Sequence, residues 1–148
     1  MEAGVVVARN RADAAEVGAH LRACDASFVP PLSERVELGA YAAKIVSRAE
    51  RFEAWSGDRL AALVAAYCNE PERRTAFITS VSVLPSFQVC GLASRLLQAS
   101  VAHVRLAGFE RIELEMDARN SAALALYRRH GFAVASTREH TLILQLTV

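Results

Sequence analysis

The stretch Val83-Leu84-Pro85-Ser86-Phe87-Gln88-Val89-Cys90-Gly91-Leu92-Ala93 says more about the fold than any other part of the chain. It predicts a strand that ends before Pro85, a short loop, and a helix that begins at Gly91. The first N–H groups of a helix have no partner within the helix, and the helix dipole adds partial positive charge there. This helix start is therefore suited to binding a phosphate group, although a glycine that only allows close packing explains the same residues.

The segments around this stretch alternate between strand and helix patterns. Strands are predicted over residues 4–8, 51–55, 60–67, 75–84, 111–116, 132–135 and 141–148, and helices over residues 11–24, 36–49, 91–107 and 121–130. Asn10 is available as the cap of the first helix, and residues 56–59 predict a hairpin turn. The order β-α-α-β-β-β-α-β-α-β-β predicts an α/β fold in the mixed, α+β sense: one sheet with helices on both faces.

The composition favours one globular domain over residues 1–148. Of the 148 residues, 53% are hydrophobic and 22% are charged, so the chain can bury a core. The net charge of +1 carries no basic excess and argues against nucleic-acid binding. The longest apolar run, residues 60–67, is far shorter than the roughly 20 residues of a membrane helix. With no signal-peptide pattern at the start, we expect a cytoplasmic protein that does not bind membranes.

The cysteines and histidines do not predict a disulfide framework or a metal site. Cys24, Cys68 and Cys90 are odd in number, widely spaced, and form no C-x-x-C pair. The histidines lack the spacing of metal ligands, and we interpret each as structural: His20, His103, His130 and His140.

Two motifs together resemble a known family. Gln88-x-x-Gly91-x-Ala93 resembles the Q/R-x-x-G-x-G/A motif of the GNAT acyltransferases, and residues 120–132 resemble the family's N-x-x-A-x-x-L-Y-x-x-x-G-F segment. The likeness in element order extends over nearly the whole chain. It implies a GNAT-like central sheet, mixed and mostly antiparallel, and an N-acetyltransferase that uses acetyl-CoA as co-substrate without a metal.

The resemblance also implies which residues hold the cofactor. In the family, the loop amides bind the pyrophosphate, and one strand splays from its neighbour so that its free edge pairs with the pantetheine arm. Carried over, the cofactor-binding residues are Val81, Ser82, Val83, Gln88, Val89, Cys90, Gly91, Leu92, Ala93, Ser94 and Asn120. We expect Phe77, Thr79, Val81 and Val83 to share one face of that strand.

The loop departs from the family at two positions. Val89 and Cys90 stand where the family usually has a glycine and a basic residue, which predicts weaker cofactor binding. A helix start lowers the pKa of a thiol, but no histidine lies near Cys90 in the sequence, so we interpret it as a small loop residue.

Tyr127 is the implied general acid for direct attack of an amine on the thioester. An amine with a pKa near 10.4 is neutral in only about one molecule in 2,500 at pH 7, so a general base would help. Many relatives carry a glutamate on the strand of Ser80, and here that strand has no carboxylate. Glu113 and Glu115 are interpreted as a solvated strand face, and the sequence leaves the base unassigned.

The acceptor is predicted to be a small-molecule or peptide amine of unidentified kind. By resemblance, the connection between the first two helices and the loop at residues 136–140 line its site, with Phe28, Leu32, Arg35 and Tyr41 as candidates. The same residues could equally form an ordinary connection and a charged helix surface. Two other readings stay open, an acyl-CoA-binding module without turnover and a structural α/β domain, as does a homodimer.

Overall fold

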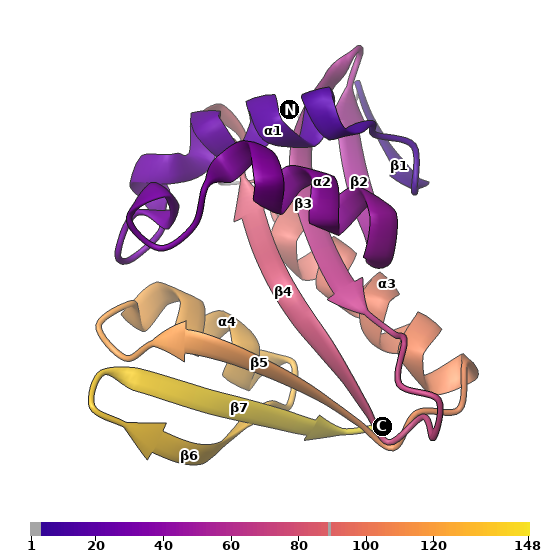
Figure 1. The fold of residues 1–148 in the computed structure, drawn as a ribbon, viewed down its shortest axis with the longest axis vertical. Coiled ribbons are helices and arrows are strands. Elements are labelled where there is room, and N and C mark those ends of the chain that lie inside the picture. Colours follow the sequence, from indigo (N-terminus) through magenta and orange to yellow (C-terminus); the bar gives the residue numbers. More distant parts are fainter. Residues whose placement is uncertain (1–3, 89) are drawn as a thin grey trace.

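The computed structural model describes residues 4–88 and 90–148 and shows a seven-stranded sheet in the order β1-β2-β3-β4-β5-β7-β6 (Figure 1). Only the β4–β5 pair is parallel, so the predicted mixed, mostly antiparallel α/β fold is confirmed. The elements are β1 (Val5–Arg9), α1 (Ala14–Cys24), α2 (Leu38–Arg48), β2 (Glu50–Ser56), β3 (Arg59–Tyr67), β4 (Thr75–Val83), α3 (Leu92–Leu106), β5 (Arg111–Asp117), α4 (Ser121–Arg129), β6 (Ala133–Arg138) and β7 (Thr141–Thr147). Short 3₁₀ turns cover Asp25–Ser27, Leu32–Glu34 and Pro85–Phe87.

The start of α1 differs from the prediction. Asp13, not Asn10, caps the helix: the Asp13 side chain accepts a hydrogen bond from the Glu16 N–H at 2.8 Å, and the Glu16 side chain accepts one from the Asp13 N–H at 3.0 Å. This reciprocal pair satisfies two backbone donors at once, which a lone asparagine cannot do. Asn10 instead has a positive φ of 56° and accepts a hydrogen bond from the Arg51 N–H.

The closing hairpin is also longer than predicted. β6 runs to Arg138, and β7 begins at Thr141, so the turn holds only Glu139 and His140. The predicted extent of the loop, residues 136–140, was wrong, because three of its five residues are paired in the sheet. That this end of the hairpin lines the acceptor site stays a prediction.

The helices lie in two layers, one on each face of the sheet. α1 and α2 pack on one face through a core cluster that includes Trp55, Leu63 and Ala65. α3 and α4 lie on the other face, where Val64 and Ile112 belong to a second and larger cluster. Neighbouring residues of β3 thus belong to different clusters, as the alternation of a strand buried on both faces requires.

A β-bulge at Thr79 reverses the alternation of β4. Ile78 pairs with Ala66 and Ser80 with Ala65, so Thr79 is an extra residue on its strand. Cross-strand partners point to the same face of a sheet, and one extra residue therefore switches the faces that follow it.

The predicted common face of Phe77, Thr79, Val81 and Val83 was consequently wrong. Val81 and Val83 pack against the cluster under α3, whereas the Thr79 side chain meets Tyr41 of α2.

β4 and β5 separate immediately before this bulge. They pair only from Thr75 with Arg111 to Ile78 with Leu114, although β4 continues to Val83 and β5 to Asp117. Figure 1 shows the two strands diverging from a common origin near the C-terminus. The splay that the resemblance implied is present, and it leaves one backbone edge of residues 79–83 without a neighbouring strand.

Candidate active site

A cavity of about 810 Å³ opens where β4 and β5 separate. Its size is typical of small-molecule sites. Most of the residues singled out in the sequence line it: Phe28, Leu32, Arg35, Tyr41, Val81, Ser82, Val83, Gln88, Ala93, Asn120 and Tyr127. Cys90, Gly91, Leu92 and Ser94 lie beside it without lining it, and Val89 lies outside the described residues.

The start of α3 has the backbone geometry that the phosphate-loop prediction requires. Gly91 precedes the helix with φ at +71°, a left-handed conformation that favours glycine, and no side chain caps the helix. Leu92 turns its side chain into the core and is 1% exposed, so its backbone is anchored. The first N–H groups of this 15-residue helix therefore stand at a fixed position beside the cavity.

The loop before α3 is held by packing and by one side-chain hydrogen bond. Cys90 packs against the larger core cluster, and its N–H donates to the Phe87 carbonyl at 3.2 Å. The Gln88 amide donates to the hydroxyl of Ser27 at 3.3 Å, which joins this loop to the end of α1. Cys90 thus occupies the position of a small, partly buried loop residue.

Ser94 and His130 join the start of α3 to the end of α4. The Ser94 hydroxyl and His130 Nε2 lie 2.8 Å apart. Partial burial, with Arg129 nearby, lowers the pKa of His130, which favours a neutral ring. The Ser94 hydroxyl is therefore already hydrogen-bonded within the protein. The backbone N–H of Ser94, in the first turn of α3, is the group of this residue that a ligand could bind.

Tyr127 is the buried phenol of the cavity wall. The residue is 8% exposed, and its ring packs edge-on against Phe132 with 6.0 Å between the ring centroids. Burial raises the pKa of Tyr127 to about 12, so the hydroxyl keeps its proton at neutral pH. Within residues 4–88 and 90–148 this hydroxyl has no hydrogen-bond partner, so it is available to a ligand.

Asn120 caps α4, as the sequence predicted. Its side-chain oxygen accepts a hydrogen bond from the Ala123 N–H at 3.1 Å. The cap places Asn120 on the cavity wall, about two helical turns ahead of Tyr127.

Two carboxylates line the cavity from β5, and only one of them is available. Arg119 binds Asp117 through its backbone N–H at 2.8 Å and through its guanidinium at 2.6 and 2.9 Å. These bonds hold the pKa of Asp117 far below its usual range, so that carboxylate stays ionised and occupied. Glu115 is exposed and has no hydrogen bond or ion pair within the described part of the chain.

Glu115 points away from the face that carries α4. Its neighbours Leu114 and Met116 pair with Leu144 and Leu142, which belong to the cluster under α3 and α4. Alternation therefore directs Glu115 to the face of α1 and α2. The solvated face predicted from the sequence holds for Glu115. Glu113, in contrast, is half-buried and accepts a hydrogen bond from Gln145 at 2.6 Å.

Tyr41 holds the bulge of β4 against α2. Its hydroxyl donates to the Thr79 carbonyl at 2.7 Å and lies 2.6 Å from the Thr79 hydroxyl. Burial raises the pKa of Tyr41, which keeps this donor protonated. Tyr41 thus supports the splayed half of β4 in addition to forming part of the cavity wall.

His20 provides a second support for the same strand. Its Nδ1 lies 2.7 Å from the Leu60 carbonyl, which can only accept, so Nδ1 carries the proton and Nε2 accepts from Ser82 at 2.8 Å. Burial lowers the pKa of His20 and favours this neutral form. The interpretation of His20 as a structural residue agrees with these contacts.

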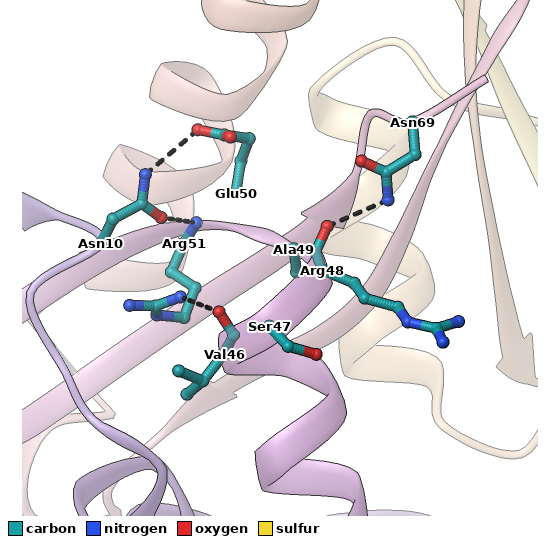
Figure 2. A pocket seen from close by; sticks show the side chains of 8 residues that line it. All are labelled: Asn10, Val46, Ser47, Arg48, Ala49, Glu50, Arg51 and Asn69. Carbon is teal, nitrogen blue, oxygen red and sulfur yellow. Dashed lines mark hydrogen bonds between the residues drawn. The ribbon is translucent and has the colours of Figure 1, made fainter. Parts of the chain in front are cut away.

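A second depression, of about 700 Å³, lies between the end of α2 and β2 and is shown in Figure 2. Its polar groups already bind one another: Asn10 bonds Glu50 and Arg51, Arg51 donates to the Val46 carbonyl, and Asn69 donates to the Arg48 carbonyl. No residue of either sequence motif lines it. Because most polar groups of this depression are already bonded and no motif residue lines it, the cavity at the splay is the better candidate site.

Two features are absent from the residues that the structure describes. None of their helices combines the length and the hydropathy that a membrane-spanning helix needs. No group of three or more histidine, cysteine or acidic side chains is placed to hold a metal ion.

Comparison with known proteins places this geometry in context. Residues 20–132 match the sequence model of the Acetyltransferase (GNAT) family. A GNAT-family protein from Desulfovibrio desulfuricans shares the fold with a TM-score of 0.80 and 20% identity, covering 97% of this chain and 98% of that one. A GNAT-family acetyltransferase from Elizabethkingia anophelis, solved with acetyl-CoA bound, gives a TM-score of 0.74 and 13% identity, covering 99% of each chain.

One curated protein also matches in sequence. A mycothiol acetyltransferase of Propionibacterium freudenreichii is 37% identical over 57 residues, which are 38% of this chain and 18% of that protein. The chain therefore aligns with less than a fifth of the length of this relative.

Proposed function

The chain belongs to the GNAT family of acetyltransferases, and on that premise we propose that it moves an acetyl group from acetyl-CoA to a primary amine. One observation carries the proposal. The unpaired edge of β4, the uncapped start of α3 and the buried phenol of Tyr127 all border the same cavity region. A strand edge and a helix start offer unpaired N–H groups, and the phenol offers a proton, which are the groups that acyl transfer from a thioester needs.

The cofactor is bound mainly by the backbone. The diphosphate accepts hydrogen bonds from the N–H groups that begin α3, and Gly91 keeps a side chain from blocking that approach. The pantetheine arm lies along the free edge of β4 and pairs with its backbone as an added strand would. Residues assigned to the cofactor are Val81, Ser82, Val83, Gln88, Val89, Cys90, Gly91, Leu92, Ala93, Ser94 and Asn120.

Tyr127 assists the departure of the sulfur through its phenol. The amine nitrogen attacks the carbonyl carbon, a backbone N–H at Val81 polarises the carbonyl oxygen, and the carbon–sulfur bond breaks. A thiol has a pKa near 8.5, whereas burial raises the pKa of Tyr127 to about 12. The phenol therefore stabilises the leaving thiolate chiefly as a hydrogen-bond donor, and the proton that the amine loses finally resides on the thiol.

Glu115 is the best candidate for the general base. It is the cavity-lining carboxylate that no arginine holds, since Arg119 occupies Asp117. It lies on the face of α1 and α2, whereas Tyr127 is a residue of α4 and packs into the core on the opposite face. The gap between β4 and β5 joins the two faces, so an amine can meet Glu115 on one side while the thioester meets Tyr127 on the other.

The alternative function is an acyl-CoA-binding module without turnover. The residues Val89 and Cys90, which depart from the family motif, favour it. Tyr127 and Glu115, a phenol and a carboxylate free to act at the cavity, favour the enzyme.

Thiol release from acetyl-CoA with a panel of primary amines separates the two functions. We expect acetyl-CoA to raise the melting temperature and the panel to contain amines that release thiol. A raised melting temperature with no thiol release would favour the binding module. No effect of acetyl-CoA on melting, at concentrations that would reveal a millimolar complex, would exclude both.

A further inference from the structure

We propose that the acceptor is an amine that also carries a negatively charged group, a carboxylate or a phosphate, and that Arg35 binds that group. The inference rests on the proposed acetyl transfer and specifies its second substrate. It comes from the charges on the cavity wall, which the two sequence motifs do not involve.

Arg35 enters the cavity from the connection between α1 and α2. It follows the 3₁₀ turn Leu32–Glu34, where its N–H donates to the Leu32 carbonyl at 2.9 Å. Leu32 is 4% exposed and belongs to the core cluster under α1 and α2, so the backbone that carries Arg35 is anchored. No ion pair or hydrogen bond occupies the guanidinium among the residues that the structure describes. An arginine held in this way can bind a carboxylate or phosphate through two parallel hydrogen bonds.

The cavity offers a single available charge of each sign. Among its lining residues, the charged ones are Arg35, Glu115 and Asp117, and Arg119 neutralises the last of these. Arg35 and Glu115 form no ion pair with each other, because they stand on different walls: one on the α1–α2 connection and one on β5. A ligand with one positive and one negative end complements both, and its ammonium end lies where Glu115 can take the proton.

Ser80 adds a buried hydroxyl to the same wall. It is 5% exposed and lines the cavity, and its Oγ lies near the Tyr41 hydroxyl but forms no hydrogen bond of normal geometry among the described residues. Its pairing with Ala65 directs it to the face of α1 and α2, the same face as Glu115. Buried hydroxyl groups without partners are rare in proteins, so this one indicates a polar ligand or water in the cavity.

Much of the rest of the wall on this side is apolar. The α1–α2 connection contributes Phe28, Val29, Pro30, Leu32 and Val36. An apolar body between the two charged ends would bury against these side chains. Amino acids with an apolar side chain have this combination of groups, whereas an alkylamine or a neutral peptide amide lacks the negative end.

The test compares amines that differ only in the negative group. L-leucine and L-leucinamide form one pair, and phosphoethanolamine and ethanolamine form another. Each is titrated by calorimetry into protein saturated with CoA, which carries no acetyl group and allows no turnover. We expect at least one anionic member to bind about tenfold more tightly than its neutral partner, since a charge-assisted hydrogen bond has about that effect. The pair that responds identifies carboxylate or phosphate as the preferred group.

Arg35→Ala should abolish this difference, and Arg35→Lys should keep part of it, because lysine retains the charge without the planar fork. Arg59→Ala is the matched control, since Arg59 is an exposed arginine at the start of β3, outside the cavity. Equal binding of both members in both pairs, or a difference that survives in Arg35→Ala, would overturn the inference.

The same measurements stay informative if the proposed function fails. Absence of thiol release from acetyl-CoA with every amine would refute acetyl transfer, whereas binding to the CoA complex still decides whether Arg35 selects a negatively charged amine. Tight binding of a neutral tetrapeptide amide that does not depend on Arg35 would point to a protein acceptor and contradict the inference.

Discussion

The two faces of the sheet at the splay present different kinds of polar groups to the cavity. On the face of α3 and α4, the polar groups that border the cavity are chiefly backbone N–H groups and the phenol of Tyr127. On the face of α1 and α2, they are side chains: Arg35, Ser80 and Glu115. Backbone groups suit a cofactor that never changes, because binding through the main chain depends little on side chains. Side chains suit the selection of a particular acceptor.

In the proposed function, this difference predicts that the loop before α3 tolerates unusual residues. The bulk and charge of Val89 and Cys90 depart from the family motif, but Gly91 still begins α3 in the left-handed conformation. A helix start keeps its N–H groups whichever side chains precede it. On the face of α1 and α2, by contrast, one substitution of Arg35 removes the only cation among the described residues that line the cavity.

Tyr127→Phe should have the largest effect. We expect turnover to fall by about a thousandfold, within the usual range for loss of a general acid, while the dissociation constant of acetyl-CoA changes little. The variant should fold, because phenylalanine keeps the edge-on contact with Phe132. Thiol release and calorimetry measure the two quantities, and unchanged turnover would remove the assignment of Tyr127.

The pH profile gives a second test of Tyr127. Because burial raises its pKa to about 12, the protonated form persists below that pH and is lost only above it. We therefore expect no loss of rate from this group between pH 7 and about pH 10. An alkaline decline near pH 9 that disappears in Tyr127→Phe would contradict the buried position.

Glu115→Gln should have the next largest effect, about a hundredfold loss of turnover at pH 7. The deficit should shrink as the pH approaches the amine pKa, near 10.4, because solvent then supplies the neutral amine. The matched control is Glu113→Gln on the same strand, which lies outside the cavity and binds Gln145. Equal losses in the two variants, or a deficit that does not change with pH, would count against Glu115 as the base.

His20→Ala should lower stability more than it affects chemistry. It leaves the Ser82 hydroxyl and the Leu60 carbonyl without their buried partner, which costs about 1–3 kcal/mol in the free energy of unfolding. Denaturant titration measures this loss.

The pH dependence of that stability has a definite sign. Because burial lowers the pKa of His20, the unfolded chain binds the proton more readily, and stability falls as the pH drops below about 6.5. We expect His20→Ala to flatten this decline between pH 7 and pH 5. A decline of unchanged steepness would show that other groups cause it.

Val89→Gly with Cys90→Arg should have the smallest effect. Restoring the family's residues adds one cation near the start of α3, and we expect acetyl-CoA to bind about two- to fivefold more tightly. Val89→Gly with Cys90→Ser is the uncharged control and should bind like the starting protein or nearly so. A weaker complex with the arginine variant would mean that the diphosphate does not lie at this helix start.

Local patterns in the sequence were sufficient to predict those features whose backbone conformation depends on neighbouring residues. The strand, loop and helix around Gly91, the Asn120 cap, and the order of the elements follow from residue types a few positions apart. The capping box of Asp13 and Glu16 was present in the sequence as well, and reading it would have corrected the Asn10 prediction. These features depend on neighbours in the chain.

The bulge at Thr79 is a feature that local sequence patterns do not predict. Residues 75–83 look like a regular strand, and no local signal marks the extra residue that switches its faces. The bulge appears only because β4 pairs with β3 in that register, with Tyr41 of α2 bound to Thr79. The face of each later residue, including Ser80, depends on this pairing.

From the sequence alone, the family and the fold could be predicted and Tyr127 could be proposed as the acid, because each rests on spacings along a continuous segment. Only the tertiary structure decided that Arg35, Ser80 and Glu115 line the same cavity, since they come from three elements far apart in the chain. Their approach depends on how α2 packs on the sheet and on where β4 leaves β5. Packing between distant segments sets that geometry, and no spacing along the chain records it.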